Sequence, residues 1–87
     1  MTIDSISLTN SFASKFPLAW DTLRNYCQHG LTSFDYIQDR GGWVATDSSG
    51  VEYIFREYRN QVISMICIHS IVVFYDGEAV FCGVPKL

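Results

Sequence analysis

Residues 62–75, with the sequence VISMICIHSIVVFY, contain no Asp, Glu, Lys or Arg. β-Branched and aromatic residues dominate this run, which favours extended strand over helix. A strand with one buried face alternates apolar and polar residues, but here both alternating sets are apolar. The even positions include Val62, Ile66, Ile68, Val72 and Phe74, and the odd positions include Ile63, Met65, Ile71, Val73 and Tyr75. A sheet built around such a strand needs a cover on each of its two faces.

The chain is too short to supply both covers easily. Its 87 residues predict one domain, residues 1–87, with a single core. Leaving four apolar side chains of one face in water would forgo roughly 6–12 kcal/mol, which is as large as a whole domain's stability. Either residues 1–8 and 31–37 fold over the second face, or another molecule covers it, because large apolar patches mark binding sites.

Helical spacing is confined to the first third of the chain. Phe12, Phe16, Ala19 and Leu23 recur at the intervals of an amphipathic helix. Pro17 has no N–H and cannot lie in mid-helix, so it belongs in the first turn. The pattern predicts a short turn over residues 10–15 and a main helix over residues 17–29 that stops at Gly30.

Turn signals divide the rest of the chain into strands. They are Ser48-Ser49-Gly50, Arg59-Asn60 and Asp76-Gly77, with His69-Ser70 as a bulge or bend within the long strand. Residues 31–40 fit either a strand or one helical turn. The sequence therefore predicts an α+β fold with one or two N-terminal helices packed on a four- to five-stranded antiparallel meander sheet.

Charge and cysteine content narrow the class of protein. The net charge is −3 and the six basic residues are scattered, which disfavours nucleic-acid binding. The apolar run is shorter than the ~20 residues of a membrane-spanning helix. An odd number of cysteines favours a reducing compartment, and the N-terminus lacks the pattern of a signal peptide. We therefore expect a cytoplasmic protein without membrane contact.

Two Cys-x-His pairs are the candidate chemical sites. Cys67 and His69 would share one side of a strand, and a thiol beside an imidazole is the core of cysteine nucleophile chemistry. Their neighbours are aliphatic and no nearby acid orients the imidazole, which favours packed core residues. Adding Cys27 and His29 would complete a zinc ligand set, but residues two apart on a helix point to different faces. We predict no catalytic residue, no metal and no cofactor.

The remaining candidates suit contact with another protein. Tyr, Trp and Arg are enriched among residues that dominate binding energy at interfaces. The predicted contact residues are Trp43, Arg56, Tyr58 and Arg59, together with the apolar face of Ile63, Met65, Ile71, Val73 and Tyr75. Trp43 opens a strand, where a large ring either caps the core or forms an interface anchor.

These features predict a non-catalytic protein-binding domain of inhibitor or adaptor type, such as an antitoxin, an immunity protein or a phage anti-defence factor. The partner is a second copy or a different protein. A homodimeric structural subunit and, with less support, a small cysteine–histidine enzyme are the alternatives.

Overall fold

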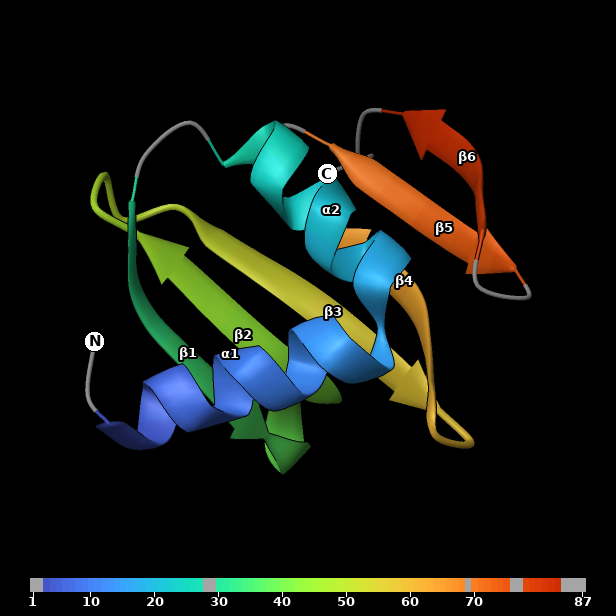
Figure 1. The fold of residues 1–87 in the computed structure, drawn as a ribbon. Helices are drawn as coiled ribbons and strands as arrows, with labels where there is room; N and C mark the ends of the chain where they lie inside the picture. Colours follow the sequence, from blue (N-terminus) through green and yellow to red (C-terminus); the bar gives the residue numbers. More distant parts are fainter. Residues whose placement is uncertain (1–2, 28–29, 69, 76–77, 84–87) are drawn as a thin grey trace.

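The computed structural model describes residues 3–27, 30–68, 70–75 and 78–83 (Figure 1). Two helices, α1 (Ile3–Lys15) and α2 (Pro17–Tyr26), precede a six-stranded sheet. Its strands are β1 (Leu31–Ile37), β2 (Gly42–Asp47), β3 (Glu52–Tyr58), β4 (Gln61–Ile66), β5 (Ile71–Tyr75) and β6 (Glu78–Gly83), with a short 3-10 helix η1 (Gln38–Arg40) between β1 and β2. Each strand pairs antiparallel with the next in the order β1-β2-β3-β4-β5-β6. The α+β meander is confirmed, with more strands than predicted.

The sequence predicted α1 only as a short turn, whereas α1 spans 13 residues. Ser, Thr and Asn make up much of this segment, and their helix propensity is low. Leu8 and Phe12 lie one helical turn apart; Phe12 belongs to the buried core, and the partly buried Leu8 packs against it. Tertiary packing of this apolar face therefore stabilises a helix that the helix propensities of its residues do not predict.

The start of α2 was predicted correctly and its end was not. Pro17 occupies the first turn, where its missing N–H costs nothing. The helix ends at Tyr26, before Gly30, and Cys27 is already extended while its N–H donates to the carbonyl oxygen of Leu23 at 2.8 Å. Gly30 does not adopt the left-handed conformation expected of a helix stop.

The ring of Phe12 is the centre of the core. It is 2% exposed, and its centroid lies 4.9–6.4 Å from the rings of five other aromatic residues: Phe16, Trp20, Phe34, Trp43 and Phe55. Phe12 itself lies in α1, and the other rings come from Phe16 between the helices, from α2, and from β1, β2 and β3. Tilted and edge-to-face aromatic contacts add to the free energy of burial. Phe12 therefore holds the helical layer against one face of the sheet.

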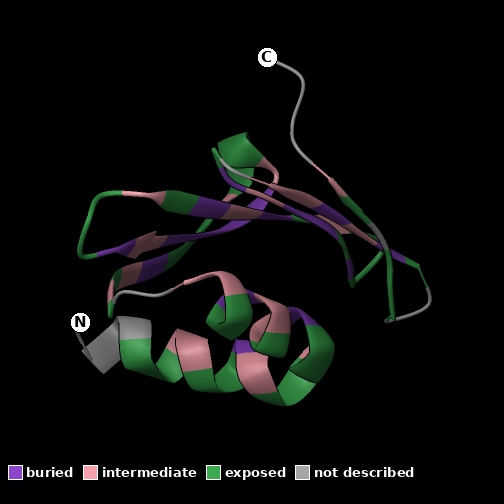
Figure 2. Ribbon diagram, turned by 90° about the horizontal axis from the view of Figure 1, so that it is seen from above, coloured by how far each residue is buried: buried purple, intermediate pink, exposed green. Residues whose placement is uncertain are grey.

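Both helices lie on that same face, as Figure 2 shows from above. The residues proposed as an internal cover for the other face do not serve as one. Within the described part of residues 1–8, α1 joins α2 on the core side, and residues 31–37 form β1 inside the sheet. Of the described elements, only η1 rises on the opposite side of the sheet. We call this opposite side the open face.

The apolar run of residues 62–75 is two strands rather than one. β4 ends at Ile66 and β5 begins at Ile71. Between them the N–H of Cys67 donates to the carbonyl oxygen of Ser70 at 2.9 Å, which closes a tight turn. The predicted bend at this place is thus a full reversal of the chain, and folding the run into a hairpin adds a strand to the sheet.

A β-bulge in β4 changes which side chains share a face. Glu57 pairs with Val62 and Arg56 pairs with Ser64, so Ile63 is the extra residue. Val62 and Met65 therefore both point into the core, with exposures of 7% and 0%. The strict even–odd division of the run was wrong, because it assumed one regular strand.

Gly42 is required where β2 passes β3. A Cβ atom at this position would overlap the carbonyl oxygen of Phe55 and lie 3.3 Å from the amide nitrogen of Glu57. Both neighbours are backbone atoms of a central strand and cannot move independently of the sheet.

We expect Gly42→Ala to lower the free energy of unfolding by about 1–3 kcal/mol or more, because overpacking forces backbone shifts. Urea denaturation measures the change. Gly30→Ala is the matched control, since nothing lies within 4 Å of a Cβ built there. Equal stabilities of the two variants would contradict the close approach of the strands.

Candidate functional site

The open face carries an apolar surface across β3, β4 and β5. In one cross-strand row, Ile54 pairs with Ile66, and Ile66 pairs with Ile71. In the next row, Arg56 pairs with Ser64, and Ser64 pairs with Val73. Side chains two residues apart on a strand share a face, so these rows lie side by side opposite the helices. Four aliphatic side chains in these rows are only half-buried: Ile54, Ile66, Ile71 and Val73.

Exposed aromatic and aliphatic side chains extend this surface toward one end of the sheet. Tyr58 and Tyr75 are the last residues of β3 and β5, which run in the same direction. Their exposures are 59% and 75%, and Ile63 in the bulge of β4 between them is 38% exposed. Large apolar side chains exposed together on one face are a feature of interaction surfaces.

Two arginines border the same surface. Arg56 is exposed in the middle of β3, and the guanidinium of Arg59 lies 5.2 Å from the ring centroid of Tyr58, a cation–π contact. Arg59 and Asn60 have φ values of 51° and 63°, which form the tight β3–β4 hairpin turn predicted from the sequence. Neither arginine forms a salt bridge with a carboxylate of the described residues.

An ion pair crosses the open face over β2, from η1 to the start of β3. Arg40 in η1 donates from both terminal nitrogens to the two carboxylate oxygens of Glu52 in β3, at 2.9 and 3.0 Å. These hydrogen bonds lower the pKa of Glu52. The pair bridges β2 on the open side, and Val44 of that strand is only 4% exposed. η1 therefore covers the open face over β2 and leaves β3, β4 and β5 uncovered.

The structure places six of the predicted contact residues around this surface: Arg56, Tyr58, Arg59, Ile71, Val73 and Tyr75. Ile63 joins them through the bulge. Trp43 and Met65 do not lie on this surface, because both point to the helices. Trp43 is 8% exposed and packs edge-on against Phe16, and Met65 is fully buried.

Sequence reasoning missed Ile54 and assigned Ile66 to the wrong alternating set. The phase of β3 was readable from Tyr53 and Phe55, whose aromatic side chains flank Ile54 in the pattern of a strand with one core face. The place of Ile66 was not readable, because a bulge and a turn on either side of it set its direction.

The Cys67–His69 site was predicted on the assumption that both residues lie on one strand, and the structure does not place Cys67 on a strand. Cys67 lies in a turn rather than on a strand and is 6% exposed, whereas His69 lies outside the described residues. Cys82 is exposed and lies near Tyr26, whose pKa is raised by burial and by a hydrogen bond with Cys82. None of the three cysteines forms a disulfide.

The predicted zinc set is incomplete in the part of the chain that is described. His29 and His69 both lie outside it. Among the side chains within it, no group of three or more His, Cys, Asp or Glu residues is placed to hold a metal ion.

One buried carboxylate, Asp47, was not singled out by the sequence. It is 2% exposed, and its Oδ1 accepts hydrogen bonds from the N–H and Oγ of Ser49 and from the N–H of Val51, at 2.6–3.0 Å. Its Oδ2 accepts a hydrogen bond from the hydroxyl of Tyr53 at 3.0 Å. Every partner lies in or next to the β2–β3 turn, so Asp47 holds this hairpin closed.

The protonation states of Asp47 and Tyr53 favour a structural role over a role in proton transfer. Hydrogen bonds donated to Asp47 lower the pKa of its carboxyl, with the Ser49 hydroxyl as the largest cause. Burial, and then the hydrogen bond to Asp47, raise the pKa of Tyr53. The carboxylate therefore stays charged and the phenol stays neutral near pH 7, and neither group is poised as a general acid or base.

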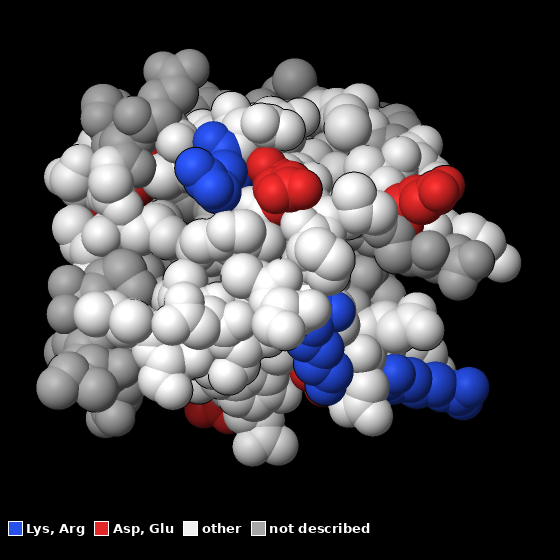
Figure 3. All heavy atoms as spheres, viewed as in Figure 1, with Lys and Arg blue, Asp and Glu red and all other residues white. Residues whose placement is uncertain are grey.

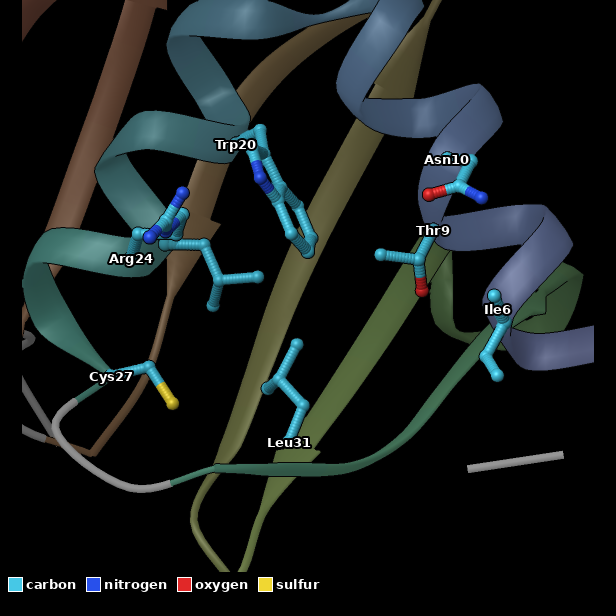
Figure 4. A pocket seen from close by; sticks show the side chains of 8 residues that line it. Ile6, Thr9, Asn10, Trp20, Arg24, Cys27 and Leu31 are labelled. Carbon is cyan, nitrogen blue, oxygen red and sulfur yellow. The ribbon is translucent and has the colours of Figure 1, made fainter.

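The helical side of the molecule carries a shallow groove of about 510 Å³ between α1, α2 and β1 (Figure 4). Trp20 and Leu31 point into it, Ile6, Thr9 and Asn10 border it from α1, and Arg24 lies at its α2 side. On this side, the few visible charged side chains of both signs form no large patch of one sign (Figure 3). The groove offers a few hydrogen-bonding groups but no pair of catalytic side chains.

Comparisons with protein-family models, with curated proteins and with solved structures find no match. In the described residues, neither α1 nor α2 has the length and hydrophobicity needed to cross a membrane. They contain 13 and 10 residues.

We expect Asp47→Asn to lower the Tm by about 5 °C or more, because it weakens a buried hydrogen-bond network. The lowered pKa of Asp47 stabilises the fold above the ordinary pKa of an aspartate, and this contribution is lost as the pH falls through the lowered value. Thermal melts between pH 7 and pH 3 should show a larger loss for wild type than for the variant. Asp35→Asn, at an exposed position of β1, is the control; a wild-type acid profile matched by Asp47→Asn would contradict this role.

Thiol titration at pH 7 distinguishes the cysteine–histidine enzyme from a packed core. The exposed Cys82 should react with a disulfide reagent at least about tenfold faster than the buried Cys67, whose access requires local opening. Peptide mass mapping assigns the modified residue, and Cys82→Ser should remove the fast phase. Rapid reaction of Cys67 in the folded protein would support the enzyme instead.

Proposed function

We propose that this protein is a non-catalytic domain that binds another protein through the open face of its sheet. The observation that carries the proposal is the apolar surface across β3, β4 and β5, which the described helices leave uncovered. The buried Cys67 and the fully hydrogen-bonded Asp47 favour binding over chemistry.

The composition of the surface supports this proposal. Half-buried isoleucines at its centre supply area that gains free energy when water is removed, at about 25 cal/mol per Å². Tyr58 and Tyr75 at its border provide large, exposed rings, and Arg56 and Arg59 provide charged groups. Aromatic and arginine side chains around an apolar centre are typical of residues that dominate interface energetics.

An inhibitor or adaptor role in a reducing cytoplasm is the form of this function that we favour. Three cysteines without a disulfide agree with a reducing compartment. A rigid sheet also presents its contact side chains with little conformational entropy to lose, which favours affinity. The homodimeric subunit is a second candidate, because the same surface is available to another copy of the chain.

Affinity capture tests the open face directly. A tagged chain, expressed in its native host together with an untagged copy, serves as bait in three forms: wild type, Tyr58→Glu/Tyr75→Glu, and Leu18→Glu. Leu18 is 48% exposed on α2, so its substitution is a matched change on the helical side.

We expect wild type and Leu18→Glu to retain a protein that the double variant loses, because two carboxylates on the apolar surface oppose its desolvation. Binding of that purified protein must then show the same order of affinities by calorimetry. Equal retention by all three baits, or no retained protein, would contradict the proposed function.

A further inference from the structure

We infer that the outer edge of β1 takes an additional strand, supplied by an extended segment of a partner protein in which apolar and basic side chains alternate. β1 lies at one end of the sheet and pairs with β2 on one side only. This edge is distinct from the open face over β3, β4 and β5, so the inference does not rest on the proposed function.

The backbone of β1 determines the kind of occupant. Residues 33–37 pair with β2 in unbroken register, from Ser33 opposite Thr46 to Ile37 opposite Gly42. In an edge strand every second residue directs its N–H and C=O groups outward, and an extended peptide can pair with this row. In the described part of the chain, no backbone hydrogen bond joins residues 33–37 to an element other than β2.

The first turns of α1 provide a cover for one side of the added strand. In Figure 1 they reach past β1, beyond this edge of the sheet. Ile6 in these turns is 49% exposed, and together with the half-buried Leu31 of β1 it lines the groove of about 510 Å³ on the helical side (Figure 4). A strand added beside Leu31 therefore lies next to this groove, which can accept one of its apolar side chains.

Tyr36 extends the apolar contacts along the same side of β1. It pairs with Trp43, the two ring centroids lie 5.2 Å apart, and Tyr36 is 48% exposed. Cross-strand neighbours on one face of an antiparallel pair contact each other directly. Side chains that the added strand directs toward the helices thus meet Leu31, Tyr36 and Ile6, and we expect them to be apolar.

The other side of the same edge is polar and acidic. Ser33 and Asp35 alternate with Phe34 and Tyr36, so their side chains point away from the helices. Asp35 is exposed, and its carboxylate has no salt bridge with any side chain that the structure describes. Opposite charges on neighbouring strands stabilise a pair, and the net charge of −3 attracts a cationic segment. A Lys or Arg therefore fits the position that faces Asp35.

Asp35 also disfavours a second copy of the chain at this edge. Full antiparallel overlap of residues 33–37 in two copies would place the two Asp35 side chains opposite each other, and like charges directly opposite destabilise a pair. The other edge of the sheet is less suited to an added strand. A bulge at Val80 interrupts the pairing of β6, and β6 is remote from α1 (Figure 1).

Titration of the purified full chain with synthetic peptides of about nine residues tests the inference. One probe alternates Val and Ile with Lys, and the other carries Glu in place of Lys. We expect the Kd of the basic probe to be lower by about threefold or more, with NMR amide shifts confined to β1, its neighbours and α1. Asp35→Lys should reverse this preference, whereas Asp21→Lys, the same charge change at an exposed position of α2, should preserve it.

Two N-methylated forms of the basic probe test the strand pairing itself. An added strand pairs through the N–H groups of alternate residues, so methylation of one alternate set should raise the Kd at least about tenfold, and methylation of the other set should leave it nearly unchanged. Ile6→Lys should weaken binding of the unmodified probe. Leu18→Lys is the matched control, because Leu18 is 48% exposed on α2, and circular dichroism verifies the fold of each variant.

Equal affinity of the two N-methylated probes, a preference that Asp35→Lys leaves unchanged, or no binding of the basic probe at about 1 mM would each overturn the inference. Self-association of the chain through residues 33–37, detected by sedimentation velocity and NMR, would make a second copy the occupant and overturn it as well. Tyr58→Glu/Tyr75→Glu should bind the basic probe as wild type does, so failure of this site and failure of the open face are distinguishable.

Discussion

The aromatic cluster around Phe12 is the contact from which the rest of the molecule's surface follows. One ring from α1 meets rings from α2 and from β1, β2 and β3, so a single cluster joins both helices to the first half of the sheet. Because these contacts fix α1 and α2 on one side, only the short η1 is left, among the described helices, for the other side. Short chains bury a small share of their surface, and this one concentrates its burial on one face.

The identity of the side chains on the open face depends on two local irregularities. The bulge at Ile63 lets Val62 and Met65 both enter the core, and the turn at Cys67 lets Ile66 and Ile71 meet as cross-strand neighbours on the outside. The apolar run of residues 62–75 thus contributes side chains to both faces of the sheet. It does so through two strands that each have their own alternation of side chains, and not through one strand with two apolar faces.

Three local features keep β2 and β3 in fixed positions. Asp47 closes the β2–β3 hairpin with four accepted hydrogen bonds, and Gly42 allows β2 to approach β3 closely. The salt bridge between Arg40 and Glu52 fastens η1 above the same strands. The uncovered region over β3, β4 and β5 is therefore presented by strands whose positions are fixed from the other side, which suits recognition by shape.

The sequence alone determined the fold class, the start of α2 at Pro17 and the turn at Arg59 and Asn60, because each depends on local backbone chemistry. It also placed Ile71, Val73 and Tyr75 on one face, since alternation within a regular strand is local as well. Only the tertiary structure decided that Trp43 and Met65 belong to the core, that α1 is a full helix and that Ile66 lies outside. Those outcomes depend on which face the Phe12 cluster covers and on a bulge between paired strands, and residues distant in sequence set both.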